Sequence, residues 1–232
     1  VLILAGEELM GAKQNRVLNT TVLIKERSEV VVPVSCTEQG RWSYRSAGFE
    51  DSGTIMASKL RALKQRSVSA SLLHHGVPSS DQQGVWDGIR TMGSRLGVSS
   101  PTSAMRDVFE ASRRILDDQL DELRPQPGQR GVVFFLNGRP AGFEWVSREH
   151  AMQVLLGRLA RSYAMQALVD EENPIDRREA PRFTAADLAS LLTRFELRTY
   201  PGVSRGHEVR LDAPGAHGAG LFEENTIIHI VV

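Results

Sequence analysis

The chain begins with short apolar runs that are typical of β-strands. Residues 1–4 have the pattern of a buried strand, and residues 20–24 and 30–34 are β-branched runs. The two runs predict a hairpin through the charged segment 25–29. Pro33 lies inside the second run, so we expect that strand to end there or to occupy a sheet edge, because proline cannot donate a ladder hydrogen bond.

The middle of the chain changes to helical spacing and predicts three helices. Apolar residues recur on one helical face from about Ala57, and again after residues 79–80, where Gly97 closes the pattern. A third pattern starts at Ser100 and ends before the Pro-Gln-Pro-Gly stretch at 125–128, the clearest linker in the chain.

Beyond that linker the pattern predicts a hairpin, two helices and short strands. Asn137-Gly138 separates two apolar runs and favours a primed hairpin turn. Ser147 is expected to cap the next helix, residues 173–181 form a charged loop, and Thr184 with Asp187 makes a capping-box variant. The last predicted strands cover residues 208–211, 219–222 and 227–232.

This order of elements predicts an α+β fold: N-terminal strands and a hairpin, a helical middle, then hairpin, helix, helix and short strands. We expect one domain over residues 1–232, with a subdomain boundary near 125–130 as the alternative. The chain has no initiator Met and opens on an apolar run at Val1, so we expect its natural N-terminal segment to be missing.

Composition narrows the classes of partner. Lys+Arg and Asp+Glu both number 28, so no net field draws the protein to nucleic acid or to an anionic membrane. No apolar run approaches the ~20 residues of a membrane span. Cys36 is the single cysteine and cannot form an internal disulfide, which is typical of a reducing compartment and predicts a cytoplasmic protein. The sequence gives no indication of the oligomeric state.

Three short polar clusters in the N-terminal region carry the candidate chemistry. They cover residues 6–8, 13–19 and 35–42, and a hairpin would bring the second and third together. Their carboxylates suit general acid–base work or hard metal ions, their arginines suit phosphate, and their amides suit ribose hydroxyls. The alternative interpretation is a buried network of ion pairs and hydrogen bonds that only fixes the strands.

Cys36 needs a separate comparison. Its spacing from Arg41 is one residue short of the phosphate-cradling Cys-x5-Arg loop, and no histidine lies nearby in the sequence to act as its base. A small buried thiol packed under Trp42 is therefore the favoured interpretation. His74-His75 lacks metal-ligand spacing, so no metal site and no cofactor are predicted; a divalent metal is an alternative that ligand spacing does not support.

On these residues the sequence resembles the ARG and rhodanese-phosphatase superfamily associated protein domain, a prokaryotic family of unknown function. The resemblance is most specific over residues 6–19 and 33–42, Gly-Glu-Glu-Leu-x-Gly-Ala-Lys-Gln-Asn-Arg-x-x-Asn and Pro-Val-Ser-Cys-x-Glu-Gln-Gly-Arg-Trp. Weaker similarity continues along nearly the whole chain. The family name records neighbouring genes for ADP-ribosylglycohydrolases and for rhodanese or phosphatase proteins, which implies work on NAD-derived or ADP-ribose-like nucleotides.

The resemblance and the clusters together define nine candidate site residues and two hypotheses. The candidate catalytic residues are Glu8, Glu38 and Cys36, and the candidate substrate-binding residues are Glu7, Gln14, Asn15, Arg16, Gln39 and Arg41. In the first hypothesis a hydrolase or other processing factor acts on the nucleotide: the arginines hold phosphate, the amides contact ribose, and Glu8 or Glu38 is the general base. In the second, the chain is a non-catalytic binding or scaffold module for a nucleotide or a partner protein. Convergent, unpaired Glu and Arg side chains around an open cleft would favour the first hypothesis, whereas buried, mutually bonded side chains would make the site structural and place the function elsewhere.

Overall fold

The computed structural model describes residues 1–170 and 184–232 and confirms the α+β class. These residues form six helices and twelve strands, and the strands pair in three antiparallel sheets. The N-terminal strands are β1 (Leu2–Ile3), β2 (Glu7–Gly11), β3 (Arg16–Leu18), β4 (Val22–Leu23), β5 (Val34–Cys36) and β6 (Phe49–Ile55). The middle helices are α1 (Ser58–His75), α2 (Gln82–Arg95), α3 (Met105–Ala111) and α4 (Arg113–Leu120). The C-terminal elements are β7 (Gly131–Leu136), β8 (Arg139–Val146), α5 (Glu149–Val169), α6 (Ala185–Leu192), β9 (Glu196–Pro201), β10 (His207–Ala213), β11 (Ala216–Glu223) and β12 (Thr226–Val231).

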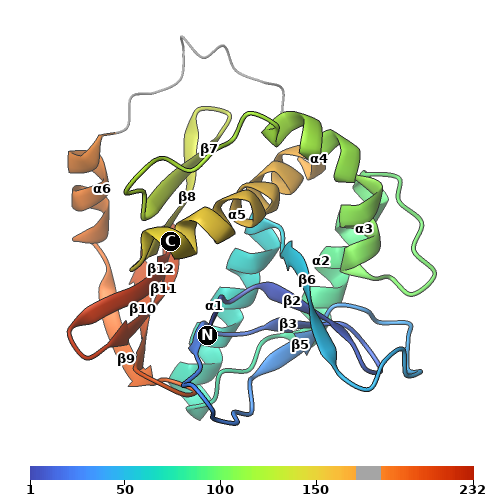
Figure 1. Cartoon of the computed structure of the whole chain (residues 1–232), viewed down its shortest axis with the longest axis horizontal. Helices are drawn as coiled ribbons and strands as arrows, with labels where there is room; N and C mark the ends of the chain where they lie inside the picture. The colour runs from blue at the N-terminus through green and yellow to red at the C-terminus, as the bar shows by residue number, and fades with distance from the viewer. Residues whose placement is uncertain (171–183) are drawn as a thin grey trace.

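Two larger sheets flank the long helices. The N-terminal sheet has the strand order β5-β3-β2-β6 and the C-terminal sheet has the order β7-β8-β12-β11-β10-β9, while β1 pairs with β4 alone. In the view of Figure 1 the six-stranded sheet lies to the left and the four-stranded sheet to the right, with α1 and α5 between them. Helix α1 contacts β11, and α5 contacts β6, β7 and β8, so these two helices join the sheets.

The apolar core follows this arrangement. One cluster packs the helices against each other through buried residues such as Ile89, Met105 and Met165. A second cluster contains Leu4 and Val146, and so joins the start of the chain to β8 and α5. Each of these two clusters therefore contains residues from both sides of the Pro-rich linker.

A buried polar network connects α1 with β8 and α5. The Arg61 guanidinium forms an ion pair with the Glu144 carboxylate, and the side chains are 3% and 0% exposed. The Tyr163 hydroxyl lies 3.3 Å from the Arg61 guanidinium and 3.4 Å from the Glu144 carboxylate. The Glu144 carboxylate also lies 3.2 Å from Nε2 of His229 on β12. Burial opposes ionisation of Glu144, but Arg61 and His229 outweigh it and hold the pKa of that carboxyl below its usual range.

Further along α1, the network reaches the other strands. The buried Lys64 ammonium donates a hydrogen bond to the Leu18 carbonyl at the end of β3. Burial, together with the nearby Arg210 and Arg61 charges, lowers the pKa of Lys64 well below its ordinary value. The Arg210 guanidinium on β10 donates to the Gln65 amide oxygen and to the Glu208 carboxylate. One helix face is thus hydrogen-bonded to both large sheets.

The expected N-terminal hairpin is wrong. Strand β4 pairs with β1, whereas β5 pairs with β3, so residues 20–24 and 30–34 do not pair with each other. The cause is local: Pro33 has no N–H to donate, and its carbonyl accepts a 2.9 Å hydrogen bond from the Asn19 amide outside any strand. Strand β5 therefore starts only at Val34.

Other local predictions have mixed outcomes. The Asn137-Gly138 hairpin is confirmed, with φ of 48° and 67° as a primed turn requires. The capping box of Thr184 and Asp187 is confirmed, with both reciprocal hydrogen bonds present. The predicted third helix is divided at Ser112 into α3 and α4, and α5 begins after Arg148 without a side-chain cap rather than at Ser147. The predicted loop at 173–181 lies outside the described residues, and the single-domain organisation stays a prediction.

The buried Arg61–Glu144 pair should contribute far more to stability than an exposed one. We expect Glu144→Gln to lower the free energy of unfolding by about 3–5 kcal/mol, because it leaves the Arg61 charge buried without a counter-ion. The matched control is Asp117→Asn, which breaks the ion pair with Arg161 on side chains that are both 45% exposed; its cost should stay below about 1 kcal/mol. Denaturant unfolding measures both values, and equal losses would contradict the assignment.

Candidate functional site

The polar clusters at residues 13–19 and 35–42 do meet, as predicted, but through a different pairing. In the ladder between β3 and β5, Arg16 lies opposite Cys36. Just beyond it, the Thr37 amide donates a 3.0 Å hydrogen bond to the Asn15 carbonyl. We call the group formed here the polar corner. It consists of Glu8, Gln14, Asn15, Arg16, Cys36, Glu38, Gln39 and Arg41.

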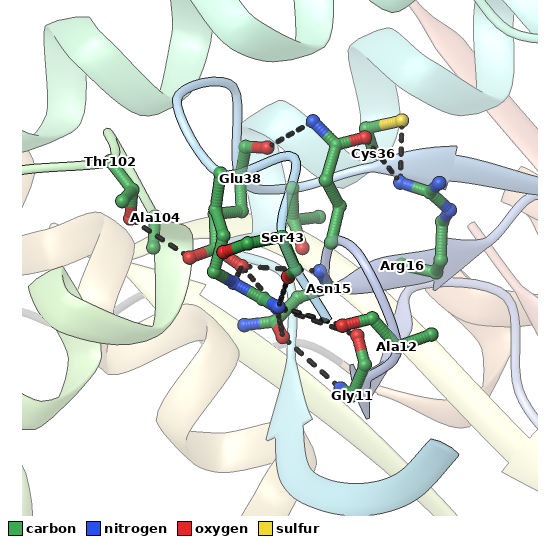
Figure 2. Close-up of polar contacts among 12 residues, drawn as sticks. Gly11, Ala12, Asn15, Arg16, Cys36, Glu38, Ser43, Thr102 and Ala104 are labelled. Carbon is green, nitrogen blue, oxygen red and sulfur yellow. Dashed lines mark hydrogen bonds and ion pairs between the residues drawn. The ribbon is translucent and has the colours of Figure 1, made fainter. Parts of the chain in front are cut away.

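Glu38 is at the centre of the polar corner and is 5% exposed. Figure 2 shows its carboxylate between Thr102 and Asn15: it accepts hydrogen bonds from the Thr102 hydroxyl at 2.9 Å and from the Asn15 amide at 3.3 Å. The Arg41 guanidinium completes the set with an ion pair at 2.7 Å. Burial opposes ionisation, but these donors outweigh it and hold the pKa of Glu38 below its usual range.

The Arg41 guanidinium is hydrogen-bonded to other groups of the same region. Its guanidinium donates to the carbonyls of Ala12 at 2.7 Å and Ser43 at 3.0 Å, and to the Asn15 side-chain oxygen at 3.2 Å. The fork therefore closes the loop between β2 and β3 instead of projecting into solvent. A phosphate would have to displace these bonds to reach it.

Gln14 and Asn15 are 0% and 2% exposed and bond to the chain itself. The Gln14 amide donates to the Glu38 carbonyl at 2.9 Å and more weakly to the Gln39 carbonyl at 3.5 Å. The Asn15 side-chain oxygen accepts from the Gly11 amide at 3.3 Å. Both amides satisfy turn backbone, which is the structural role expected of buried Asn and Gln side chains.

Glu8 is the least satisfied member of the polar corner. It is 0% exposed, and one carboxylate oxygen accepts a 2.6 Å hydrogen bond from the Thr37 hydroxyl. The other oxygen has no partner among the described residues. Burial raises the pKa of Glu8 to about 7, against the opposing effects of Thr37, Ser52 and Arg106. This proton affinity suits an acid–base group at neutral pH, but the carboxyl has no exposure to a substrate.

Glu7 lies apart from the polar corner. Although Glu7 and Glu8 are neighbours on β2, Glu8 bonds to Thr37 and Glu7 does not. Glu7 accepts a 2.7 Å hydrogen bond from the Leu4 amide and lies 3.4 Å from the Arg158 guanidinium of α5. Burial raises the pKa of its carboxyl. The two glutamates therefore contact different parts of the protein, and their common role in one site stays a prediction.

Cys36 is partly exposed, not buried under Trp42 as expected, and Trp42 is itself 68% exposed. The cation beside its sulfur is Arg16 and not Arg41: the Arg16 guanidinium donates to Sγ at 2.7 Å and to the Gln14 side-chain oxygen at 3.0 Å. Figure 2 shows Arg16 and Cys36 facing each other from adjacent strands. The cross-strand register, which the sequence does not display, sets this pair.

Two residues of α2 join the polar corner without having been predicted as site residues. The Gln82 side chain accepts a hydrogen bond from the Cys36 amide at 2.7 Å and donates one to the Cys36 carbonyl at 2.9 Å. It thus bonds to the backbone of β5 in the way that the backbone of a neighbouring strand does. The Arg90 guanidinium donates to the Gln39 side-chain oxygen at 2.6 Å. A helical position some 50 residues away carries no local signal for such contacts.

Two cavities formed by the described residues lie elsewhere. The larger, about 740 Å³, is bounded by α1, α6, the β7–β8 hairpin and the start of β11. The smaller, about 190 Å³, lies between α1 and strands β9, β10 and β11. None of the nine candidate residues lines either cavity.

A hydroxyl, an imidazole and a carboxylate are also lined up in the interior. Nδ1 of His229 lies 3.0 Å from the Thr21 hydroxyl, and its Nε2 faces Glu144. A hydroxyl, an imidazole and a carboxylate also follow each other in this order in the triads of nucleophilic enzymes. The three side chains are only 8%, 1% and 0% exposed in the order Thr21, His229, Glu144, and the Thr21 hydroxyl also accepts from the Ala5 amide. Burial leaves no approach for a substrate, so we interpret the array as structural.

The described residues contain neither a cluster of metal-ligating side chains nor a membrane-spanning helix. Residues 1–170 and 184–232 contain no group of three or more His, Cys, Asp or Glu side chains placed to hold a metal ion. In the same ranges no helix combines the length and the apolar character needed to cross a bilayer.

The described residues form an α+β protein of three antiparallel sheets in which residues of the N-terminal motifs build a polar corner. The chain belongs to the ARG and Rhodanese-Phosphatase-superfamily-associated Protein domain family, because the model of that family matches residues 1–232. No curated protein matches the chain, and no solved structure matches it. The family description records an association with these proteins and names neither a ligand nor a reaction.

The raised pKa of Glu8 predicts a pH-dependent contribution to stability. The folded state binds the Glu8 proton more tightly than the unfolded state, with a pKa of about 7 against 4.5. Folding stability from this group is therefore present below pH 4.5 and is lost as the pH rises toward 7 and above. We expect Glu8→Gln to remove this loss, so that the variant gains roughly 2–3 kcal/mol relative to the wild type between pH 5 and pH 8.

Urea unfolding at pH 5, 6, 7 and 8 measures the difference between the two proteins. Glu110→Gln on α3 removes an exposed carboxylate and serves as the matched control. A wild-type to Glu8→Gln difference that does not change with pH would show that Glu8 is not the buried acid described.

Proposed function

We propose that this protein recognises an NAD-derived, ADP-ribose-like nucleotide without converting it. The observation that carries the proposal is the direction of the polar corner's charges. Its carboxylates, Glu8 and Glu38, are buried, whereas Arg16 and Gln39 are partly exposed and Arg90 is exposed. The outer rim thus offers guanidinium and amide groups, which suit phosphate and ribose, and withholds the groups that would act as acid or base.

The rim is organised by a chain of hydrogen bonds. The Arg16 guanidinium donates to the Gln14 side-chain oxygen, the Gln14 amide donates to the Gln39 carbonyl, and the Gln39 side-chain oxygen accepts from Arg90. The two arginines are therefore held on either side of the same pair of glutamines. Arg90 also pairs with Asp87, but both side chains are about half exposed, and such a pair contributes little in water.

The same geometry favours the non-catalytic hypothesis over the enzymatic one. The Glu38 carboxylate accepts from Arg41, Thr102 and Asn15, so proton transfer to it would disrupt three interactions. Glu8 has a suitable proton affinity but lies beneath the strand surface at 0% exposure. A preorganised scaffold that presents Arg16 accounts for the density of polar residues without a reaction.

Calorimetric titration with ADP-ribose tests the proposal. We expect Arg16→Ala and Arg90→Ala each to weaken binding about tenfold to a hundredfold, because each removes a charged hydrogen bond to phosphate. Arg113→Ala is the matched control, since Arg113 at the start of α4 forms an i,i+3 ion pair with Glu110 of α3, outside the polar corner. Unchanged affinity in Arg16→Ala and Arg90→Ala would contradict the proposed site.

Product analysis of the same mixtures separates binding from turnover. We expect ADP-ribose to be recovered intact. Turnover that Glu8→Gln or Glu38→Gln abolishes in a folded variant would instead establish the enzymatic hypothesis.

A further inference from the structure

A face of α1 that the polar corner does not use lines both cavities. Residues 59, 62, 63 and 66 border the larger cavity, and residues 66, 69, 70, 73 and 74 border the smaller. These positions follow the helical spacing of three and four, so they form one continuous stripe. Arg66 and His217 line both cavities, so the two adjoin along α1, and we refer to them together as the cleft.

The larger part of the cleft is mainly apolar. Leu63 on α1, Phe143 on β8 and Leu191 on α6 are among its walls. Leu63 is 58% exposed, although a leucine at such a position would normally be covered. The volume of about 740 Å³ lies within the range of about 300–1,000 Å³ that is typical of small-molecule sites. We call this part the apolar cavity.

The smaller part, which we call the basic pocket, is lined by three arginines and one carboxylate. The arginines are Arg66, Arg198 and Arg210. The carboxylate, Asp212, lies 2.7 Å from Nδ1 of His217. Arg210 is paired with the buried Glu208 carboxylate, so Arg66 and Arg198 supply the remaining positive charge of the lining.

The arginines of the basic pocket have unused donors. Arg210 is 3% exposed, and its Nε has no hydrogen-bond partner among the described residues. Within the same residues Arg66 forms no ion pair, and Arg198 lies 3.7 Å from Glu196, a carboxylate with 78% exposure. A buried guanidinium N–H without an acceptor is costly, and an anionic oxygen in the pocket would satisfy it.

We propose that this cleft binds an organic phosphate with an apolar body. The phosphate lies in the basic pocket against Arg66, Arg198 and Arg210, and the apolar body lies in the apolar cavity against Leu63, Phe143 and Leu191. Two guanidinium groups, together with the free Nε–H of Arg210, suit the several oxygens of a phosphate. The inference goes beyond the proposed function, because the cleft is built from α1, α6 and the C-terminal sheet and shares no residue with the polar corner.

Titration calorimetry of the full chain with three probes tests the cleft. 1-Naphthyl phosphate carries both features, inorganic phosphate carries only the anion, and 1-naphthol carries only the apolar body. We expect 1-naphthyl phosphate to bind at least about tenfold more tightly than either half. Arg66→Ala should weaken 1-naphthyl phosphate and inorganic phosphate alike, and Leu191→Asp should weaken 1-naphthyl phosphate while sparing inorganic phosphate.

The variants separate the cleft from a general charge effect. Arg66 is exposed, so Arg66→Ala leaves the core intact, and Arg114→Ala on α4 is the matched control because Arg114 is exposed and lines neither cavity. No binding of 1-naphthyl phosphate at millimolar concentration, or binding that Arg66→Ala does not weaken, would overturn the inference. Binding lost in Arg16→Ala and kept in Arg66→Ala would assign the anion to the polar corner and also overturn it.

Discussion

The rest of the structure depends on the buried ion pair between Arg61 and Glu144. Arg61 is on α1 and Glu144 is on β8, beyond the Pro-rich linker. Removing either charge from water costs several kcal/mol, and the partner charge and its hydrogen bonds must offset that cost. The two halves of the chain therefore have to fold against each other to form the pair. Lys64 shows the same cost of burial, because burial together with the nearby Arg210 and Arg61 charges lowers its pKa well below the ordinary value.

The polar corner obeys the same constraint on a smaller scale. Glu38, Arg41 and Asn15 are bonded to each other and to backbone groups of the β2–β3 loop, so the motif stabilises the loop. The cationic groups nearer the surface are Arg16, which lies beside Cys36, and Arg90 of α2, which lies beside Gln39. A dense set of catalytic residue types can thus be a scaffold for a few exposed binding groups. The cleft along α1 differs from the polar corner, because the residues that line its two cavities include none of the candidate site residues.

The sequence predicted those features that depend on neighbours in the chain. The Asn137-Gly138 turn and the Thr184–Asp187 capping box are such features, because a few adjacent residues determine their geometry. Pairing between distant strands was not predictable in this way, which is why the expected hairpin was wrong and Arg16 was not paired with Cys36 in advance. The buried face of α1 was also hidden. Arg61, Lys64 and Gln65 occupy the i, i+3 and i+4 positions that apolar residues fill in an ordinary amphipathic helix, so no apolar pattern marked that face as buried.

Native-state hydrogen exchange tests most directly whether the α1 network makes the two sheets one cooperative unit. The backbone amides of β3 in the N-terminal sheet and of β10 in the C-terminal sheet are compared. The account predicts that the slowest amides of both strands exchange with the free energy of global unfolding, and that Arg61→Met lowers both by the same amount. Exchange of one sheet through an opening of lower free energy, with the other sheet still protected, would contradict it.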